Sequence, residues 1–254
     1  RGAAGPDRDG AGRDGAGMKW LALALALLGG AAEASCRQAL ALGLDVSGSV
    51  DAREYRLQID GLAAALGSPA VYDALMQMPG TPVELMVYEW SGPEDPAVIL
   101  PWTAITGPAV LEAVRAQIRS TERRAASPGT ALGLAMREGL RHLETRTHCL
   151  KLTLDISGDG KSNLGPRPLF ERSAFEATDI VINALVIGAD SPSIGDLRQA
   201  EVSALSRYFQ SEVIWGPGSF VETALGFEDY AEAMARKLQR ELETVIIGGL
   251  SAQR

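Results

Sequence analysis

Leu42-Gly-Leu-Asp-Val-Ser-Gly-Ser-Val50 is the stretch of this sequence that decides the fold. It places Asp45, Ser47 and Ser49 at alternate positions where an apolar strand, expected over residues 39–46, runs out and a helix follows. The carboxylate and the hydroxyls then face one point. Hard oxygen ligands of this kind suit a small divalent cation such as Mg²⁺ or Mn²⁺. The stretch therefore predicts a strand, loop and helix that carry part of a metal site.

Two later segments offer oxygen ligands of the same kind. Ser127-Pro-Gly-Thr130 leads into a helix expected over residues 130–144, and Ile156-Ser-Gly-Asp-Gly160 closes a second apolar strand, expected over residues 150–156. Taken singly, each of these residues could simply cap a helix or shape a turn. Taken together, they give a set of candidate metal ligands: Asp45, Ser47, Ser49, Thr130 and Asp159.

Apolar runs typical of strands alternate with segments of helical periodicity along the chain. Strands are expected over residues 39–46, 83–90, 97–102, 150–156, 180–187 and 220–224. Helices are expected over residues 52–66, 69–77, 108–120, 130–144, 167–178, 201–209 and 227–243. This alternation predicts an α/β fold with a doubly wound, mainly parallel sheet covered by helices on both faces. The polar, proline-containing loop 91–96 predicts one antiparallel strand at the sheet edge, and the tail from Thr244 has no predicted structure.

The predicted topology and the candidate ligands indicate the same edge of the sheet. In doubly wound sheets, ligands bind outside the carboxyl ends of the strands, at the point where the strand order reverses. Here that point is expected between strands 39–46 and 150–156, which end close to Asp45 and Asp159. We therefore expect these two carboxylates to lie close together.

The three segments, in this order, resemble the metal-ion-dependent adhesion site of von Willebrand factor A-type domains. The resemblance covers nearly all of the chain after residue 36 and implies a Rossmann-like von Willebrand factor A fold. Other runs are similar to a bacterial family of secreted von Willebrand factor A-type proteins that is described only as a domain of unknown function. These runs are Asp45–Asp51, Glu54-Tyr55, Glu89-Trp90-Ser91, Pro101-Trp102-Thr103, Ser157–Gly160 and Gly216–Phe220.

The resemblance also implies roles for the candidate ligands. The hydroxyls of Ser47, Ser49 and Thr130 would bind the cation directly, and Asp45 and Asp159 would act largely through bridging waters. An open coordination position would then accept an Asp or Glu carboxylate from a partner protein. The chain departs from the wider superfamily in one respect, because Ser-Gly-Asp-Gly stands where Thr-Asp-Gly is more usual. If Asp155 replaced Asp159 as a ligand, this model would need revision.

Other polar residues near the motifs are expected to have structural roles. Asp155 alternates with apolar neighbours in a central strand, which favours a buried, hydrogen-bonded carboxylate over a metal ligand. Glu89 is expected at the surface, although it could line the rim of the site, and Asn163 is expected to shape a turn. Asp51 or Ser49 is expected to cap the helix 52–66.

The beginning of the chain predicts export. Residues 1–17 are mainly Gly, Ala, Asp and Arg, as in a disordered extension or an over-called start. Residues 18–34 have a basic start, a short Leu/Ala run and an Ala32-x-Ala34 pattern, which is typical of a signal peptide cleaved near Ala34. We therefore expect a periplasmic or secreted protein whose mature chain is a single domain, residues 35–254.

Composition excludes some partners. The chain of 254 residues is 46% hydrophobic and 22% charged, as in an ordinary globular domain. The net charge is −8, and it stays at −8 after cleavage because the leader region carries equal numbers of acidic and basic residues. No basic tract indicates nucleic-acid binding, and no run after the leader is apolar enough to span a membrane. The sequence does not indicate the oligomeric state.

The two cysteines are expected to form a disulfide. Cys36 lies nine residues before Asp45, and Cys149 lies ten before Asp159. If the two strands run side by side with their carboxyl ends together, the cysteines meet at the opposite edge. Export permits such a bond, and two buried free thiols are the less favoured alternative.

These features predict an exported, metal-dependent protein-binding module rather than an enzyme. Only two histidines are present, His142 and His148, and neither is expected near the candidate ligands, so a zinc site or Ser-His-Asp triad there is not indicated. Two alternatives remain open. Asp carboxylates with Mg²⁺ could hydrolyse phosphate esters, although no general base or nucleophile is evident beyond the ligands themselves. The site could also be a structural feature that is never occupied.

Overall fold

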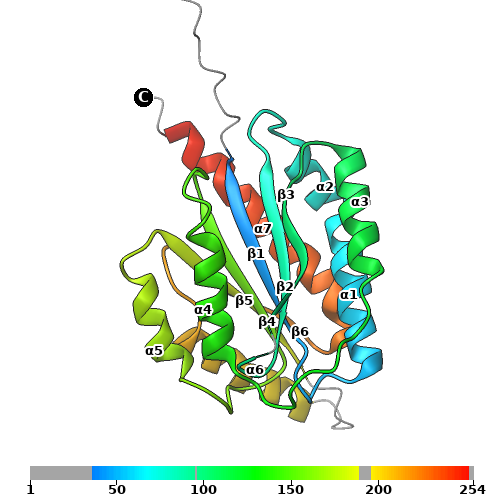
Figure 1. Cartoon of the computed structure of the whole chain (residues 1–254), viewed down its shortest axis with the longest axis vertical. Helices are drawn as coiled ribbons and strands as arrows, with labels where there is room; N and C mark the ends of the chain where they lie inside the picture. Colours follow the sequence, from blue (N-terminus) through cyan, green and yellow to red (C-terminus); the bar gives the residue numbers. More distant parts are fainter. Residues whose placement is uncertain (1–35, 95, 189–195, 252–254) are drawn as a thin grey trace, which may run out of the picture. The chain divides into compact units, whose positions relative to one another are not determined.

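The described strands form one sheet in the order β3-β2-β1-β4-β5-β6 (Figure 1). The computed structural model describes residues 36–94, 96–188 and 196–251, so the predicted extension 1–17 and signal peptide 18–34 lie outside the described residues. The strands are β1 (Gln38–Asp45), β2 (Val83–Trp90), β3 (Ala97–Ala104), β4 (Leu152–Gly158), β5 (Ile180–Ile187) and β6 (Val221–Ala224). All neighbouring strands pair in parallel except β2 and β3, which pair antiparallel at one edge. The predicted doubly wound sheet is confirmed.

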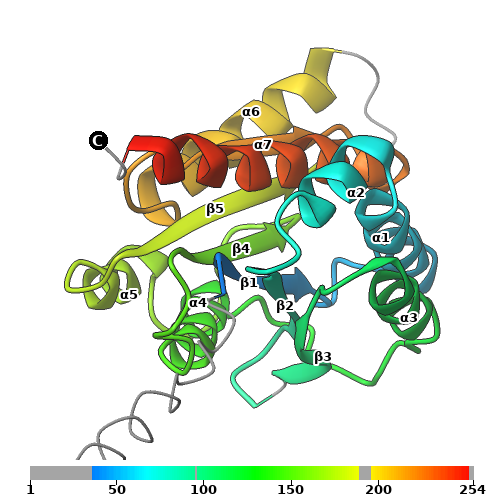
Figure 2. The same cartoon turned by 90° about the horizontal axis from the view of Figure 1, so that it is seen from above.

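Helices cover both faces of the sheet. The helices are α1 (Ala52–Leu66), α2 (Pro69–Met76), α3 (Pro108–Arg119), α4 (Leu132–Leu143), α5 (Pro168–Arg172), α6 (Asp196–Glu212) and α7 (Tyr230–Ser251), with 3₁₀ turns η1 (Ser173–Phe175) and η2 (Phe227–Asp229). One hydrophobic core includes residues of α1, α2, α3 and α7, and the other includes residues of α4 and α6. Figure 2 shows α1 and α3 on the opposite side of the sheet from α4.

The central strand β1 supplies both cores. Leu40, Leu42 and Leu44 belong to one core, while Ala39 and Ala41 belong to the other, because successive side chains of a strand point to opposite faces. Every residue of β1 is buried, which explains its nearly continuous apolar sequence. The end of this strand is therefore held rigidly, and the residues that follow it begin from a fixed position.

A glycine in β1 makes room for a tyrosine that ties the sheet to α4. A Cβ atom on Gly43 would lie 2.7 Å from the ring and hydroxyl of Tyr88. The Tyr88 hydroxyl donates a hydrogen bond of 2.8 Å to the carbonyl of Ala135. Burial raises the pKa of Tyr88 well above its usual value, so this hydroxyl keeps its proton for the bond. Substitution of Gly43 would displace the ring or break this contact.

The amino edge of the sheet is cross-linked. Cys36 and Cys149 form the predicted disulfide, which joins the segments that lead into β1 and β4 across 113 residues of sequence. Backbone hydrogen bonds run beside it, from Leu150 N to Cys36 O at 2.9 Å and from Ala39 N to Lys151 O at 2.9 Å. On the chain-entropy model, a loop of this length contributes roughly 4–5 kcal/mol.

Some predicted boundaries differ from the structure. The segment 167–178 forms only the short α5 and the turn η1, and α6 begins before the predicted residue 201. The tail from Thr244, for which the sequence predicted no element, is helical, because α7 continues to Ser251. The Val-Ile-Ile run after Thr244 has low intrinsic helix propensity, but no proline interrupts it and the preceding helix propagates into it.

Candidate metal centre

Three segments meet at the carboxyl edge of the sheet. β1 ends at Asp45, and β4, which pairs with β1, ends at Gly158 just before Asp159. Thr130 lies in the loop before α4, and its segment is joined to the first loop by a hydrogen bond of 3.2 Å from Gly48 N to Pro128 O. The strand order reverses between β1 and β4, as predicted.

The cap of α1 frees Ser49 for other contacts. Asp51 Oδ1 accepts a hydrogen bond from Glu54 N at 2.8 Å, and Glu54 Oε2 accepts one from Asp51 N at 2.7 Å, which forms a capping box. Of the two residues expected to cap this helix, Asp51 is the one that does so. Ser49 is exposed and its hydroxyl faces the loop after β4.

The five candidate residues are linked by hydrogen bonds. Thr130 Oγ1 lies 3.3 Å from Ser47 Oγ, which lies 3.1 Å from Ser49 Oγ. Ser49 Oγ donates to Asp159 Oδ1 at 2.7 Å, and Asp45 Oδ1 accepts from Ser47 N at 2.9 Å. Residues separated by up to 114 positions in the sequence thus bring hydroxyl and carboxylate oxygens into one cluster.

Asp45 is the unusual member of this cluster. It is fully buried, and its Oδ2 atom has no hydrogen-bond partner among the described residues. Burial, together with the nearby Asp159 carboxylate, raises the pKa of Asp45 to about 7. Burial also raises the pKa of Asp159. An unpaired buried carboxylate oxygen is costly, and either a proton or a bound cation would relieve that cost.

No basic side chain of the described residues forms an ion pair with Asp45 or Asp159. Arg123 donates to backbone carbonyls of the loop after β1 instead, with Nη2 2.6 Å from Val50 O and 3.4 Å from Ser47 O. The donor set is therefore carboxylate and hydroxyl oxygen, and no basic side chain in the described part of the chain pairs with its carboxylates. These properties fit a small hard dication such as Mg²⁺ or Mn²⁺.

Two amides that the sequence analysis did not assign to the site hold its loops. Asn163 Oδ1 accepts from Thr130 N at 2.8 Å, and Asn163 N donates to Thr130 O at 3.0 Å. Gln58 Nε2 donates to the carbonyl of Asp45 at 3.0 Å and is fully buried. A glutamine on the apolar face of the helix 52–66 was the available signal for this contact, because a buried polar side chain requires a partner.

Glu89 was wrongly expected at the surface. It is 1% exposed, its Oε1 accepts a hydrogen bond of 2.5 Å from the Tyr55 hydroxyl, and its Oε2 lies 3.3 Å from Arg124 Nε. Tyr55 in α1 supplies the contact that the strand sequence alone could not reveal.

Asp155 is buried, as predicted, and forms an ion pair of 2.5 Å with Lys237 in α7.

Comparison with known proteins places this architecture in a family. A family model with the description "Protein of unknown function (DUF1194)" matches residues 35–246. The chain belongs to this family. A search among curated proteins finds no match to this DUF1194 sequence. The expected resemblance to a bacterial family of this description is confirmed.

Solved structures that resemble this DUF1194 chain have the von Willebrand factor A fold. The mussel byssus protein PTMP1 "with zinc occupied MIDAS motif" has a TM-score of 0.56 at 13% identity, over 83% of this chain and 47% of that chain. A "von Willebrand factor type A" protein from Catenulispora acidiphila has a TM-score of 0.52 at 14% identity, over 83% and 43%. The pilus adhesin SpaC from Lactobacillus rhamnosus GG has a TM-score of 0.53 at 13% identity, over 83% and 31%.

These likenesses define the fold of the DUF1194 chain, which spans about half or less of the length of these structures.

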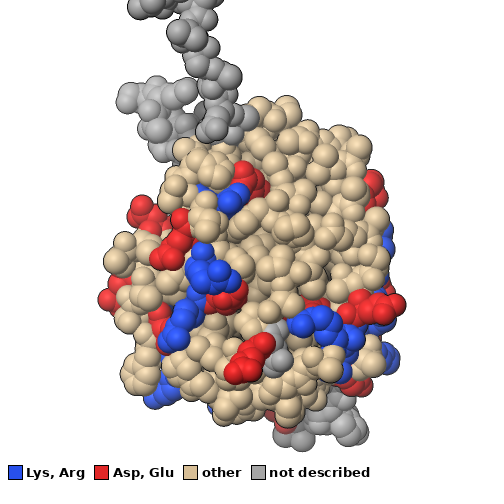
Figure 3. All heavy atoms as spheres, in the orientation of Figure 1, with Lys and Arg blue, Asp and Glu red and all other residues tan. Residues whose placement is uncertain are grey.

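The face shown in Figure 3 carries acidic and basic side chains side by side rather than one patch of a single sign. Among the described residues, no helix combines the length and the apolar character that crossing a membrane requires.

Proposed function

We propose that this protein is an exported protein-binding module that holds Mg²⁺ or Mn²⁺ through Asp45, Ser47, Ser49, Thr130 and Asp159. The observation that carries the proposal is the buried Oδ2 atom of Asp45, which has no partner within a cluster made entirely of oxygen donors. A dication would supply the missing positive charge. It would also offer an open coordination position to an Asp or Glu carboxylate of a partner protein.

The likeness to solved structures supports this use of the site. The mussel byssus protein is described with a zinc-occupied MIDAS motif, and SpaC is described as a pilus adhesin. Both descriptions fit a role in which the carboxyl edge of the sheet contacts another protein. The choice of Mg²⁺ or Mn²⁺ rests on the donor set, because oxygen ligands alone favour hard cations.

A binding role is also favoured over catalysis at this edge. Beyond the candidate ligands themselves, the cluster has no histidine, cysteine or lysine that could act as a general base or a nucleophile. Its hydroxyls are already engaged with one another and with Asp159. We therefore propose that the protein is not an enzyme, and that phosphate esters are not its substrates.

Export is supported by two separate features. Residues 18–34 have the sequence pattern of a signal peptide, and Cys36 and Cys149 form a disulfide. Structural disulfides of this kind are typical of oxidising compartments such as the periplasm or the extracellular space. We propose a periplasmic or secreted location after cleavage near Ala34.

Calorimetric titration with Mg²⁺ and Mn²⁺ tests the metal site directly. Wild type should bind one ion, and Asp45→Ala should lose the binding. Asp179→Ala is the matched control, because Asp179 is a carboxylate just before β5, at the opposite edge of the sheet. Equal binding by wild type and Asp45→Ala would contradict the proposal.

A pull-down from periplasmic extract then tests the partner. Capture should require Mg²⁺ or Mn²⁺, should disappear in Asp45→Ala, and should be reduced by free carboxylate competitors. Metal-independent capture would contradict the role of the ion. Metal-dependent hydrolysis in a panel of phosphate esters, lost in Asp45→Ala, would instead favour the alternative of a hydrolase.

A further inference from the structure

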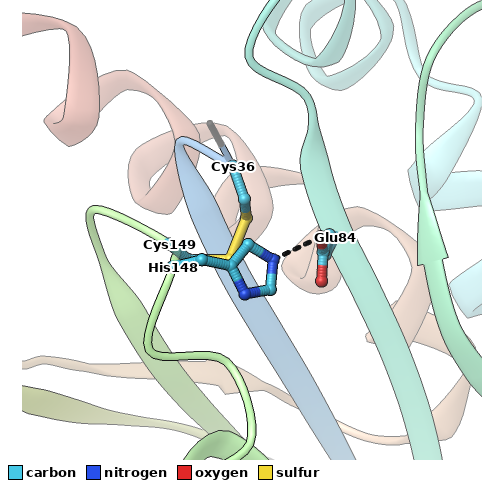
Figure 4. A group of neighbouring side chains, drawn as sticks. All are labelled: Cys36, Glu84, His148 and Cys149. Atoms are coloured by element: carbon cyan, nitrogen blue, oxygen red, sulfur yellow. Dashed lines mark hydrogen bonds and ion pairs between the residues drawn. A yellow bond between two sulfur atoms is a disulfide. The ribbon is translucent and has the colours of Figure 1, made fainter. Parts of the chain in front are cut away.

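A second group of metal-ligating side chains lies at the amino edge of the sheet, away from the candidate site just described. Cys36 precedes β1, Glu84 belongs to β2, and His148 and Cys149 lie in the turn that leads to β4 (Figure 4). One ligand atom from each of these four residues lies within 4.8 Å of the others. We call this group the amino-edge cluster.

The chemistry of the amino-edge cluster differs from that of the carboxyl edge. Two sulfur atoms, an imidazole nitrogen and a carboxylate oxygen make a donor set that suits tetrahedral Zn²⁺. In the oxidised protein the sulfurs are bonded to each other, and His148 Nε2 lies 2.9 Å from Glu84 Oε1. In that state, the sulfurs lack the thiolate form that binds a metal.

We propose that reduction of the Cys36–Cys149 disulfide converts the amino-edge cluster into a Zn²⁺ site formed by Cys36, Cys149, His148 and Glu84. A dithiol supplies two electrons and two protons: its sulfurs become a disulfide, the protein S–S bond breaks, and two thiols form. Binding of Zn²⁺ then releases both thiol protons. The disulfide and the zinc ion are thus alternative cross-links between the segments that lead into β1 and β4.

The backbone keeps the cysteines close when the S–S bond is broken. Leu150 N donates to Cys36 O at 2.9 Å, and Ala39 N donates to Lys151 O at 2.9 Å. Glu84 is held beside them because β2 pairs with β1 in parallel, with Glu84 opposite Ala39. None of these contacts involves the sulfur atoms, so we expect reduction to leave the two thiols adjacent.

The surroundings of Glu84 and His148 also fit a metal site. Arg146 lies 3.2 Å from Glu84 Oε2, which leaves Oε1 directed toward His148. A contact of this kind orients a ligating carboxylate. His148 is 47% exposed, whereas Cys36 and Cys149 are nearly buried, so His148 offers the side from which an ion can enter.

Zinc titration of oxidised and reduced protein, with a chromophoric chelator as competitor, tests the proposal. An Asp45→Ala background removes the other candidate site. The reduced protein should bind one Zn²⁺ per chain at the cluster, and the oxidised protein should bind none. Co²⁺ added to the reduced protein should give thiolate-to-cobalt charge-transfer absorption and the visible bands of a tetrahedral ion.

Single substitutions identify the ligands without removing the cysteines. His148→Ala and Glu84→Gln should each weaken Zn²⁺ binding to the reduced protein by at least roughly tenfold. His142→Gln is the matched control, because His142 lies on α4 and packs against Tyr88, so its variant should bind zinc as the parent does. Unchanged affinity in both His148→Ala and Glu84→Gln would overturn the proposed ligand set.

The comparison of zinc binding by the reduced and the oxidised protein tests the role of the disulfide. Equal zinc binding by reduced and oxidised Asp45→Ala protein would overturn the proposal, as would cobalt spectra without the charge-transfer band. Loss of Mg²⁺ binding in Asp45→Ala, with a wild-type response at the amino-edge cluster, would support both proposals separately. The proposed zinc site can therefore be tested independently of the function proposed for the carboxyl edge.

Discussion

Two pairs of carboxylates lie beside the same strand, β4, and they differ in whether a basic side chain pairs with them. Asp155 and Glu241 are buried against Lys237, whose ammonium lies 2.5 Å from one and 2.7 Å from the other. Asp45 and Asp159, at the carboxyl edge, have no ion pair with any basic side chain of the described residues. The interior pair has a cation supplied by the chain itself, whereas we propose that the edge pair takes its cation from outside.

Further polar groups contact the interior pair, although Asp155 Oδ1, Asp155 Oδ2 and Glu241 Oε2 accept no hydrogen bond from the described residues. Asn183 Nδ2 donates to Glu241 Oε1 at 2.6 Å, and Lys151 Nζ donates to Glu241 O at 3.2 Å. Burial disfavours the charge of Lys237, but Asp155 and Glu241 outweigh it and raise the pKa of this lysine. Burial raises the pKa of Asp155 to about 7, although Lys237 opposes the shift. Asp155 is therefore the carboxyl group of this network that burial shifts toward its protonated form.

The largest predicted effect breaks the interior network. Lys237→Met leaves two buried carboxyl groups without their cation, so the free energy of unfolding should fall by about 3–5 kcal/mol. Urea denaturation measures this change. The combined variant Asp155→Asn, Lys237→Met and Glu241→Gln removes all three charges and should recover most of the loss. A Lys237→Met variant as stable as wild type would show that the interior charges do not depend on one another.

The second prediction concerns the edge pair. Mg²⁺ at about one hundred times its dissociation constant should raise the free energy of unfolding of wild type by about 2.7 kcal/mol, because the ion binds only the folded state. Asp45→Asn should show no such increase in the same urea titration. Lys237→Met serves as the control, because its folded protein should still respond to Mg²⁺. A metal response that survives in Asp45→Asn would remove the distinction between the two pairs.

The third prediction uses pH to examine the interior pair. The pKa of Asp155 is about 7 in the folded state, above the ordinary value near 4, so its stabilising contribution is complete at low pH and is lost as pH rises through 7. Between pH 5 and 8, the difference in unfolding free energy between wild type and Asp155→Asn should shift by about 2.5 kcal/mol in favour of the variant. A constant difference over this range would contradict the raised pKa.

The smallest predicted effect separates a structural carboxylate from the candidate ligands. Asp51 lies close to Ser49 in sequence but caps α1. Asp51→Ala should therefore lower the unfolding free energy by about 1 kcal/mol and leave Mg²⁺ binding unchanged. Asp51→Asn retains the cap and should behave as wild type in denaturation. Loss of Mg²⁺ binding in both variants would instead make Asp51 part of the metal centre.

The sheet and the candidate site could be predicted because both depend on local residue spacing and on the order of neighbouring strands. Alternation in residues 42–50 brought Asp45, Ser47 and Ser49 together, and the reversal of strand order brought Asp159 beside them. Both arguments depend on patterns within one strand or between neighbouring strands. The candidate site and the sheet could therefore be predicted from the chain alone.

Side-chain contacts between a strand and a helix distant in sequence could not be predicted in this way. Asp155 and Lys237 are 82 positions apart, and only the packing of α7 against the sheet joins them. Glu89 required Tyr55 from α1, which nothing in its own strand indicated. A buried charge can be suspected from its apolar neighbours, but its partner depends on how a distant helix docks.

The position of the disulfide determines how this chain can be stretched. The bond encloses 113 positions of sequence, including the loops that carry Asp45 and Thr130, but leaves Asp159 outside the ring. Under tension applied to its two ends, the enclosed segment cannot lengthen, so the contour length released on unfolding should be shorter by roughly 380 Å than in the reduced chain. Asp159 lies in the segment that bears the load, whereas the loops of Asp45 and Thr130 lie inside the disulfide-closed ring. Pulling on the ends would therefore separate Asp159 from these loops and open the carboxyl edge, while most of its oxygen donors stay within the ring.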